Sequence, residues 1–85
     1  MTHRILVIDD ETGIRDAFEL ALAGDPQLAV ETAASGAEGI AKAAAARPDL
    51  VFLDLNMPEM NGVETMRRLL GADPTLRIYI VTAFH

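Results

Sequence analysis

The chain of 85 residues suffices for one small domain, and its 51% apolar content is typical of a globular core and too high for a disordered chain. Thirteen acidic residues against seven basic ones give a net charge of −6, which argues against direct nucleic-acid binding by these residues, because neutralising phosphates requires Lys and Arg. The longest strongly apolar runs have four residues against the ~20 that span a bilayer, and cysteine is absent. We therefore expect a cytoplasmic protein with no membrane partner.

Continuous apolar runs predict the strands. Three such runs stand out, at residues 5–8, 50–53 and 78–81. They do not alternate between apolar and polar side chains, which is typical of strands that are buried on both faces of a parallel sheet. The segment 28–33 is more polar, with Glu31 and Thr32 inside it, and predicts a strand at the edge of the sheet.

Helical spacing fills the segments between these runs. The first helix has one apolar stripe at i, i+3, i+4 and i+7, formed by Ile14, Ala17, Phe18 and Ala21. Gly24 and Pro26 then end this helix. The second helix begins at an S-x-x-E capping box, Ser35 to Glu38, and continues toward Pro48. The third is expected to begin at Asn61, with Glu64 at its third position, to carry Val63, Met66 and Leu70 on one face, and to end near Gly71.

The order strand-helix-strand-helix-strand-helix-strand predicts an α/β fold with right-handed crossovers. The expected architecture is the flavodoxin-like three-layer doubly wound parallel sheet of strand order 2-1-3-4-5, here without its last helix-strand-helix. The fourth strand would then be an open edge, and one face of the sheet would lack a covering helix. Such an edge favours self-association, so we expect either a fragment or a surface that another molecule covers.

Polar side chains follow the strands at the edge where such sheets bind ligands. Asp9 and Asp10 follow the first strand, Asp54 follows the third and Thr82 ends the fourth. The first and third strands should be neighbours, so their three carboxylates should converge. Like charges at this distance require a compensating cation, and oxygen ligands suit Mg²⁺.

Each of these residues also has a purely structural interpretation. An acidic pair after a strand is by itself more often a helix N-cap. A single Asp at a strand end is often a turn residue, and Thr82 would by default be an ordinary strand threonine. The coincidence of all four at one edge of one predicted sheet favours a functional site.

The segment VFLDLNMPEMNG at residues 51–62 resembles the phosphorylation loop of response-regulator receiver domains in two-component signalling systems. Asp9 and Asp10 are similar to the acidic pair of that family, and residues 81–83 to its switch motif in the fourth strand. The resemblance covers the whole chain in the same order. Residues 1–85 are therefore identified as a receiver domain that is incomplete at its C-terminus.

The resemblance implies that Asp54 takes a phosphoryl group from a sensor histidine kinase or a small acyl phosphate. Asp10 and Asp54 would bind Mg²⁺ directly, with the Asn56 backbone carbonyl as a third ligand and Asp9 acting largely through water. The Thr82 hydroxyl would hydrogen-bond the phosphoryl group, and the resulting conformational switch would control an output. Such a module is not an enzyme beyond its own phosphorylation and dephosphorylation.

Two alternatives stay open. The family places a lysine at the end of a fifth strand, beyond the last residue here, and the only lysine, Lys42, lies within the second predicted helix. A shortened receiver could then serve as an interaction or dimerisation module without phosphorylation. A phosphatase of the haloacid-dehalogenase type is disfavoured, because Asn56 stands where that class needs a second Asp, and its nucleophile follows the first strand.

Overall fold

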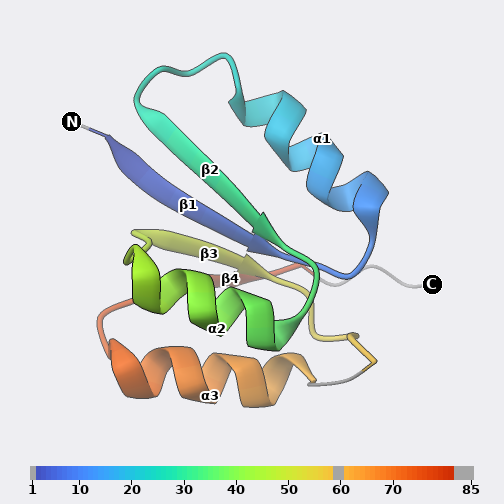
Figure 1. Cartoon of the computed structure of the whole chain (residues 1–85), viewed down its shortest axis with the longest axis vertical. Coiled ribbons are helices and arrows are strands. Elements are labelled where there is room, and N and C mark those ends of the chain that lie inside the picture. Colours follow the sequence, from blue (N-terminus) through green and yellow to red (C-terminus); the bar gives the residue numbers. More distant parts are fainter. Residues whose placement is uncertain (1, 59–60, 82–85) are drawn as a thin grey trace.

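The computed structural model describes residues 2–58 and 61–81 and contains the predicted alternation of strands and helices. Figure 1 shows the elements in chain order. They are β1 (His3–Ile8), α1 (Thr12–Leu22), β2 (Leu28–Ala33), α2 (Gly36–Ala45), β3 (Leu50–Leu53), α3 (Gly62–Ala72) and β4 (Arg77–Ile80). The first strand thus begins two residues earlier than the apolar run, and the last one is shifted by one residue.

All strand pairs are parallel, and the order is β2-β1-β3-β4. This is the first part of the order 2-1-3-4-5, so the flavodoxin-like fold is confirmed. β2 lies at the edge, as its polar residues predicted. β1 and β3 are neighbours, with Ile8 beside Leu53 at their carboxyl ends. The strand order reverses between β1 and β3, and in such sheets ligands bind at the carboxyl ends of the strands beside this point, where the candidate site must therefore lie.

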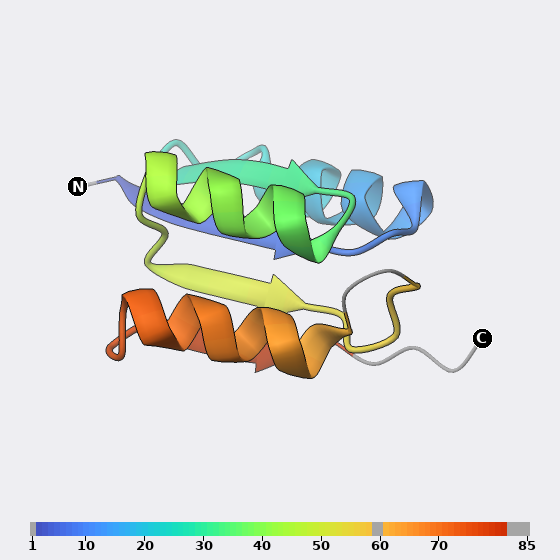
Figure 2. The same cartoon turned by 60° about the horizontal axis from the view of Figure 1, so that its bottom comes forward.

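The helices form layers on both faces of the sheet. Figure 2 shows α2 and α3 in front of the strands and α1 behind them. The core lies on the side of α2 and α3, where apolar side chains of β1 and β3 meet those of the two helices. Its buried members include Leu6, Ile8, Val51, Leu53 and Leu69. This packing holds the carboxyl ends of β1 and β3 in place.

The buried face of α3 differs from the predicted one. Val63 is 44% exposed, whereas Gly62, Thr65 and Leu69 are buried. Met66 does pack against the core, so the prediction was only partly wrong. The reason is Gly62: a Cβ there would lie only 2.7 Å from the carbonyl oxygen of Asp54 and would also strike the backbone of Leu55. A helix that approaches the loop after β3 this closely must turn position 62, and not position 63, toward the sheet.

The opposite face of the sheet is only partly covered within the described residues. α1 has no buried residue. The Phe18 ring packs at a tilt against the Phe52 ring, with centroids 4.8 Å apart, and the Phe52 ring stacks on the Tyr79 ring at 5.9 Å. Tyr79 is nevertheless 56% exposed. Over the same described residues, no helix combines the length and apolar character needed to cross a membrane.

Candidate functional site

Backbone hydrogen bonds extend past the strand ends and fix the first residues of two loops. The Asp54 N–H donates to the Ile8 carbonyl at 3.0 Å, and the Asp9 N–H donates to the Ala33 carbonyl at 3.0 Å. Both aspartates are thus held in the sheet like strand residues, although they are the first polar residues after β1 and β3. Their side chains point from a rigid edge, which suits a site that must hold its geometry.

Each of these two carboxylates accepts a hydrogen bond from the backbone two residues further on. Asp9 Oδ1 accepts from the Glu11 N–H at 2.9 Å, and Asp54 Oδ1 accepts from the Asn56 N–H at 3.0 Å. These local turns are the structural role expected of aspartate after a strand. These hydrogen bonds involve only the Oδ1 oxygen of each carboxylate, so they do not account for the second oxygen.

The second oxygen of Asp54 has no hydrogen-bond partner among the described residues, although it is buried. Asp54 is only 1% exposed and Asp9 only 4%. One oxygen each of Asp9, Asp10 and Asp54 lies within 4.8 Å of the others. A turn residue at the surface would not need such burial, and an unpartnered buried carboxylate oxygen is costly. The purely structural interpretation therefore does not account for Asp54.

The electrostatics of this cluster of three carboxylates, the acidic cluster, are unfavourable without a cation. Burial raises the pKa of Asp9 above its ordinary value, and the charges of Asp54, Asp10 and Glu11 raise it further. The hydrogen bond from the Glu11 backbone opposes part of this shift. Burial and the neighbouring negative charges thus make ionisation of Asp9 less favourable.

The acidic cluster fits a hard divalent cation. All of its donors are carboxylate oxygens, which Mg²⁺ prefers, and the open side at exposed Asp10 leaves room for waters and for a phosphate oxygen. Two ligands of one Mg²⁺ lie roughly 3 to 4 Å apart for metal–oxygen distances of about 2.1 Å. The three oxygens lie within 4.8 Å of one another, a limit somewhat wider than this range, so the side chains would have to draw together around the ion.

Arg15, which belongs to no motif in the sequence, lies at the carboxyl ends of the same strands. Arg15 Nη1 donates to the Asp9 backbone carbonyl at 2.7 Å, and its Nη2 donates to the Thr12 hydroxyl at 3.1 Å. The sequence does hold one hint. Arg15 stands in the first turn of a helix that follows the acidic pair, and a cation there opposes the helix dipole, so its presence calls for another reason.

The remaining predicted residues have different positions. Asn56 contributes its N–H to the turn at Asp54 and its side chain is exposed. Thr82 lies outside the described residues. Lys42 is engaged elsewhere: its Nζ donates to the Thr32 carbonyl at 2.5 Å and pairs with Glu38 at 3.2 Å.

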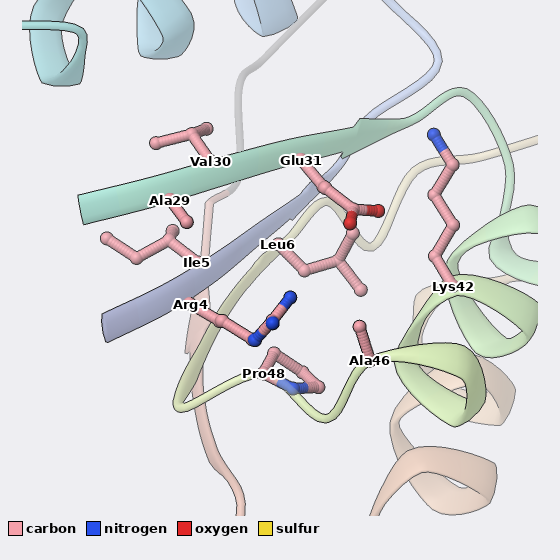
Figure 3. A pocket seen from close by; sticks show the side chains of 9 residues that line it. All are labelled: Arg4, Ile5, Leu6, Ala29, Val30, Glu31, Lys42, Ala46 and Pro48. Atoms are coloured by element: carbon pink, nitrogen blue, oxygen red, sulfur yellow. The ribbon is translucent and has the colours of Figure 1, made fainter. Parts of the chain in front are cut away.

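A separate small hollow of about 50 Å³ lies between β1, β2 and α2 (Figure 3). Arg4 and Glu31 point toward it, Pro48 and Ala46 lie at its base, and Lys42 runs along its side toward the end of β2. Its lining contains two positively charged side chains, Arg4 and Lys42, and one carboxylate, Glu31. These residues do not lie at the carboxyl ends of the strands, where such sheets bind ligands. The acidic cluster, and not this hollow, is therefore the candidate site.

Comparison with known proteins places this geometry in a family. The family model of the response regulator receiver domain matches residues 5–85. A protein-glutamate methylesterase/protein-glutamine glutaminase 2 of Cereibacter sphaeroides is 42% identical over 78 residues, which are 91% of this chain and 21% of that protein. The DNA-binding transcriptional activator DevR/DosR of Mycobacterium tuberculosis is 39% identical over 82 residues, 95% of this chain and 38% of that protein.

A solved structure of the response regulator protein TrrA from Thermotoga maritima, in complex with Mg(2+)-BeF, superposes with a TM-score of 0.89. It is 32% identical, and the match covers 98% of this chain and 71% of that one. The chain belongs to the response regulator receiver domain family, a regulatory module of two-component systems. It spans about a fifth of the length of the methylesterase relative, so the activity of that whole protein does not transfer to it.

Proposed function

We propose that this chain is a Mg²⁺-dependent phosphoacceptor, in which Asp54 takes a phosphoryl group from the phosphohistidine of a sensor histidine kinase. The observation that carries the proposal is the buried, unpartnered oxygen of Asp54 within 4.8 Å of the oxygens of Asp9 and Asp10. Family membership and the Mg²⁺-containing TrrA structure support the same assignment.

In the proposed reaction, a carboxylate oxygen of Asp54 attacks phosphorus and forms a new P–O bond. The P–N bond to the donor histidine breaks, its electron pair stays on the imidazole nitrogen, and that nitrogen takes up a proton. The Asn56 N–H holds one oxygen of Asp54 and so fixes the plane of the carboxylate during attack. Phosphoryl transfer depends mainly on such positioning and on charge neutralisation.

Asp10 and Asp54 would hold Mg²⁺ directly, with the Asn56 carbonyl as a third ligand and Asp9 acting largely through water. The bound ion supplies positive charge to the phosphoryl oxygens in the transition state. Burial of Asp9 and Asp54 excludes water from one side of the acidic cluster and strengthens this interaction. For Thr82, the family resemblance supports a hydroxyl that binds the phosphoryl group and biases the output switch.

Intact-mass spectrometry tests the proposal. The protein is incubated with a small acyl phosphate in Mg²⁺ or in EDTA, next to an Asp54→Asn variant. A gain of one phosphoryl group in the wild type with Mg²⁺, and in neither control, is expected. A gain of equal size in the variant or in EDTA would refute the assignment.

A second proposal concerns self-association. Among the described residues β4 pairs with β3 alone, and Tyr79 and Ile80 on it are 56% and 43% exposed. Such an edge favours pairing with another molecule. Light scattering over a hundredfold range of concentration tests it: a mass that stays monomeric throughout would exclude this surface as a dimer interface.

We further propose that residues 1–85 belong to one C-terminally incomplete receiver unit, which the 71% coverage of TrrA supports.

A further inference from the structure

The geometry points to Arg15 as a positioning residue for the acidic cluster: its guanidinium clamps the loop that carries Asp9 and Asp10, so that their carboxylates face Asp54. This inference rests on the proposed Mg²⁺ site and adds a residue to it. The clamp has two contacts, one from Nη1 to the Asp9 carbonyl at 2.7 Å and one from Nη2 to the Thr12 hydroxyl at 3.1 Å.

The position of Arg15 on α1 makes this contact natural. Side chains on a helix lean toward its N-terminus, so a residue in the first turn reaches back over the segment that precedes the helix. Arg15 is the fourth residue of α1 and is half-buried. It spans the loop between β1 and α1 and joins the last residue held by the sheet, Asp9, to the first residue of the helix, Thr12.

Hydrogen bonds hold the loop at both of its ends, since the Glu11 carbonyl also accepts from the Arg15 N–H at 3.2 Å, and the clamp adds a bond on the carbonyl side of Asp9. Asp9 is tied to the sheet through its N–H and to Glu11 through its carboxylate. Asp10 lies between them and is exposed. Repulsion within the acidic cluster pushes this loop away from Asp54. A charge-assisted hydrogen bond to the Asp9 carbonyl resists that movement from the backbone side.

The charge of Arg15 has effects of both signs: a positive charge beside the acidic cluster attracts its carboxylates in the metal-free protein, but this position also carries two costs. A positive charge in the first turn of a helix opposes the helix dipole, and one beside a cation site weakens metal binding by repulsion. The pKa of Glu38, on α2, is lowered mainly by the hydrogen bond from the Ala34 N–H and next by its hydrogen bond with Lys42. The charge of Arg15 lowers this pKa by a smaller amount, so its field reaches α2 as well. Any cation would supply the attraction, whereas the two hydrogen bonds to the Asp9 carbonyl and the Thr12 hydroxyl use the fork of the guanidinium.

The two effects of Arg15 on Mg²⁺ affinity have opposite signs, and this makes the inference testable. If Arg15 is only a nearby charge, Arg15→Met removes repulsion and Mg²⁺ binds more tightly, while Arg15→Lys changes nothing. If Arg15 positions the loop, Arg15→Met weakens Mg²⁺ binding by about tenfold, the lower end of the range for groups that orient metal ligands. Arg15→Lys then gives an intermediate loss, because an ammonium keeps the charge but lacks the planar fork.

Isothermal titration calorimetry with Mg²⁺ alone measures these affinities on the wild type, both Arg15 variants and Arg47→Met. Arg47 lies before the amino end of β3, away from the carboxyl ends where the acidic cluster lies, and pairs with Asp73 at 3.3 Å. Its loss should therefore leave Mg²⁺ binding unchanged. Circular dichroism verifies that each variant is folded. If Arg15→Met does not fold, the Mg²⁺ affinity of Arg15→Lys alone distinguishes the two explanations. Weaker binding in both Arg15 variants supports the clamp; equal or tighter binding overturns it. Absence of binding in the wild type would instead overturn the proposed Mg²⁺ site itself.

Discussion

Replacing Asp54 by asparagine should stabilise the metal-free protein. Asparagine keeps an oxygen that accepts the Asn56 N–H, and its NH₂ group takes the place of the unpartnered oxygen. One buried negative charge is removed, and a donor then faces the carboxylates of Asp9 and Asp10. The substitution therefore relieves repulsion and satisfies a buried polar atom together.

The size of the effect follows from the separations in the acidic cluster. Two unit charges 4.8 Å apart repel by about 0.9 kcal/mol in water and by about 3.5 kcal/mol at an effective dielectric constant of about 20. Asp10 is exposed and solvent screens its charge, whereas Asp9 is buried beside Asp54. We expect Asp54→Asn to raise the free energy of unfolding by about 1 to 3 kcal/mol, and each kcal/mol should raise Tm by about 4–8 °C in a domain of this size.

Urea unfolding followed by circular dichroism, in EDTA and in Mg²⁺, measures this effect. Mg²⁺ at ten times its Kd should stabilise the wild type by about 1.4 kcal/mol and the variant by much less. Asp25→Asn is the matched control, because Asp25 Oδ1 accepts the Gln27 N–H at 2.9 Å in the same kind of turn but is exposed. It should change stability by less than about 0.5 kcal/mol. An Asp54→Asn variant that is no more stable than the wild type in EDTA would refute the argument from repulsion.

Three further predictions concern packing and pH. Gly62→Ala should destabilise the fold by about 1–3 kcal/mol, because its Cβ would meet backbone atoms, whereas Gly71→Ala, in open space on α3, should stabilise it by about 0.5–1 kcal/mol; chemical unfolding of both decides. Leu69→Ala should cost about 2–5 kcal/mol by leaving a cavity in the core, and a loss below 1 kcal/mol in the same assay would contradict the packing of α3. The pKa of Asp9 is raised in the folded state, so in EDTA its contribution favours folding at low pH and declines as pH rises from about the ordinary value of 3.8 through the raised value. Subtracting the pH profile of Asp9→Asn from that of the wild type should show this decline, and a difference that grows with pH would contradict it.

Much of the fold could be predicted from the sequence because burial on both faces leaves a plain pattern. The run at residues 50–53 became β3 with the same bounds, and the polar segment at 28–33 became the edge strand β2. The capping signals also located the helix starts: Ser35 and Asn61 accept from the Glu38 and Glu64 N–H groups. The carboxylate of Glu38, however, accepts from the Ala34 N–H and not from Ser35 as in the usual capping box.

The orientation of α3 could not be predicted, since it depends on a contact between distant segments. Apolar periodicity favoured Val63 as an inward residue, but the missing side chain of Gly62 lets the helix approach the loop after β3. Arg15 was passed over for a similar reason. Its role depends on a backbone carbonyl, and carbonyls leave no trace in the sequence. The convergence of Asp9, Asp10 and Asp54 followed from strand order alone, whereas the roles assigned to them remain predictions.

The most direct test of the central claim is to locate the phosphoryl group. After incubation with a small acyl phosphate and Mg²⁺, borohydride reduction converts an aspartyl phosphate to homoserine, and peptide mass spectrometry finds the changed residue. We predict homoserine at position 54 and unchanged aspartate at Asp9 and Asp10. Homoserine at either of those positions, or none at position 54 in protein that has gained a phosphoryl group, would contradict the assignment of Asp54 as the phosphoacceptor.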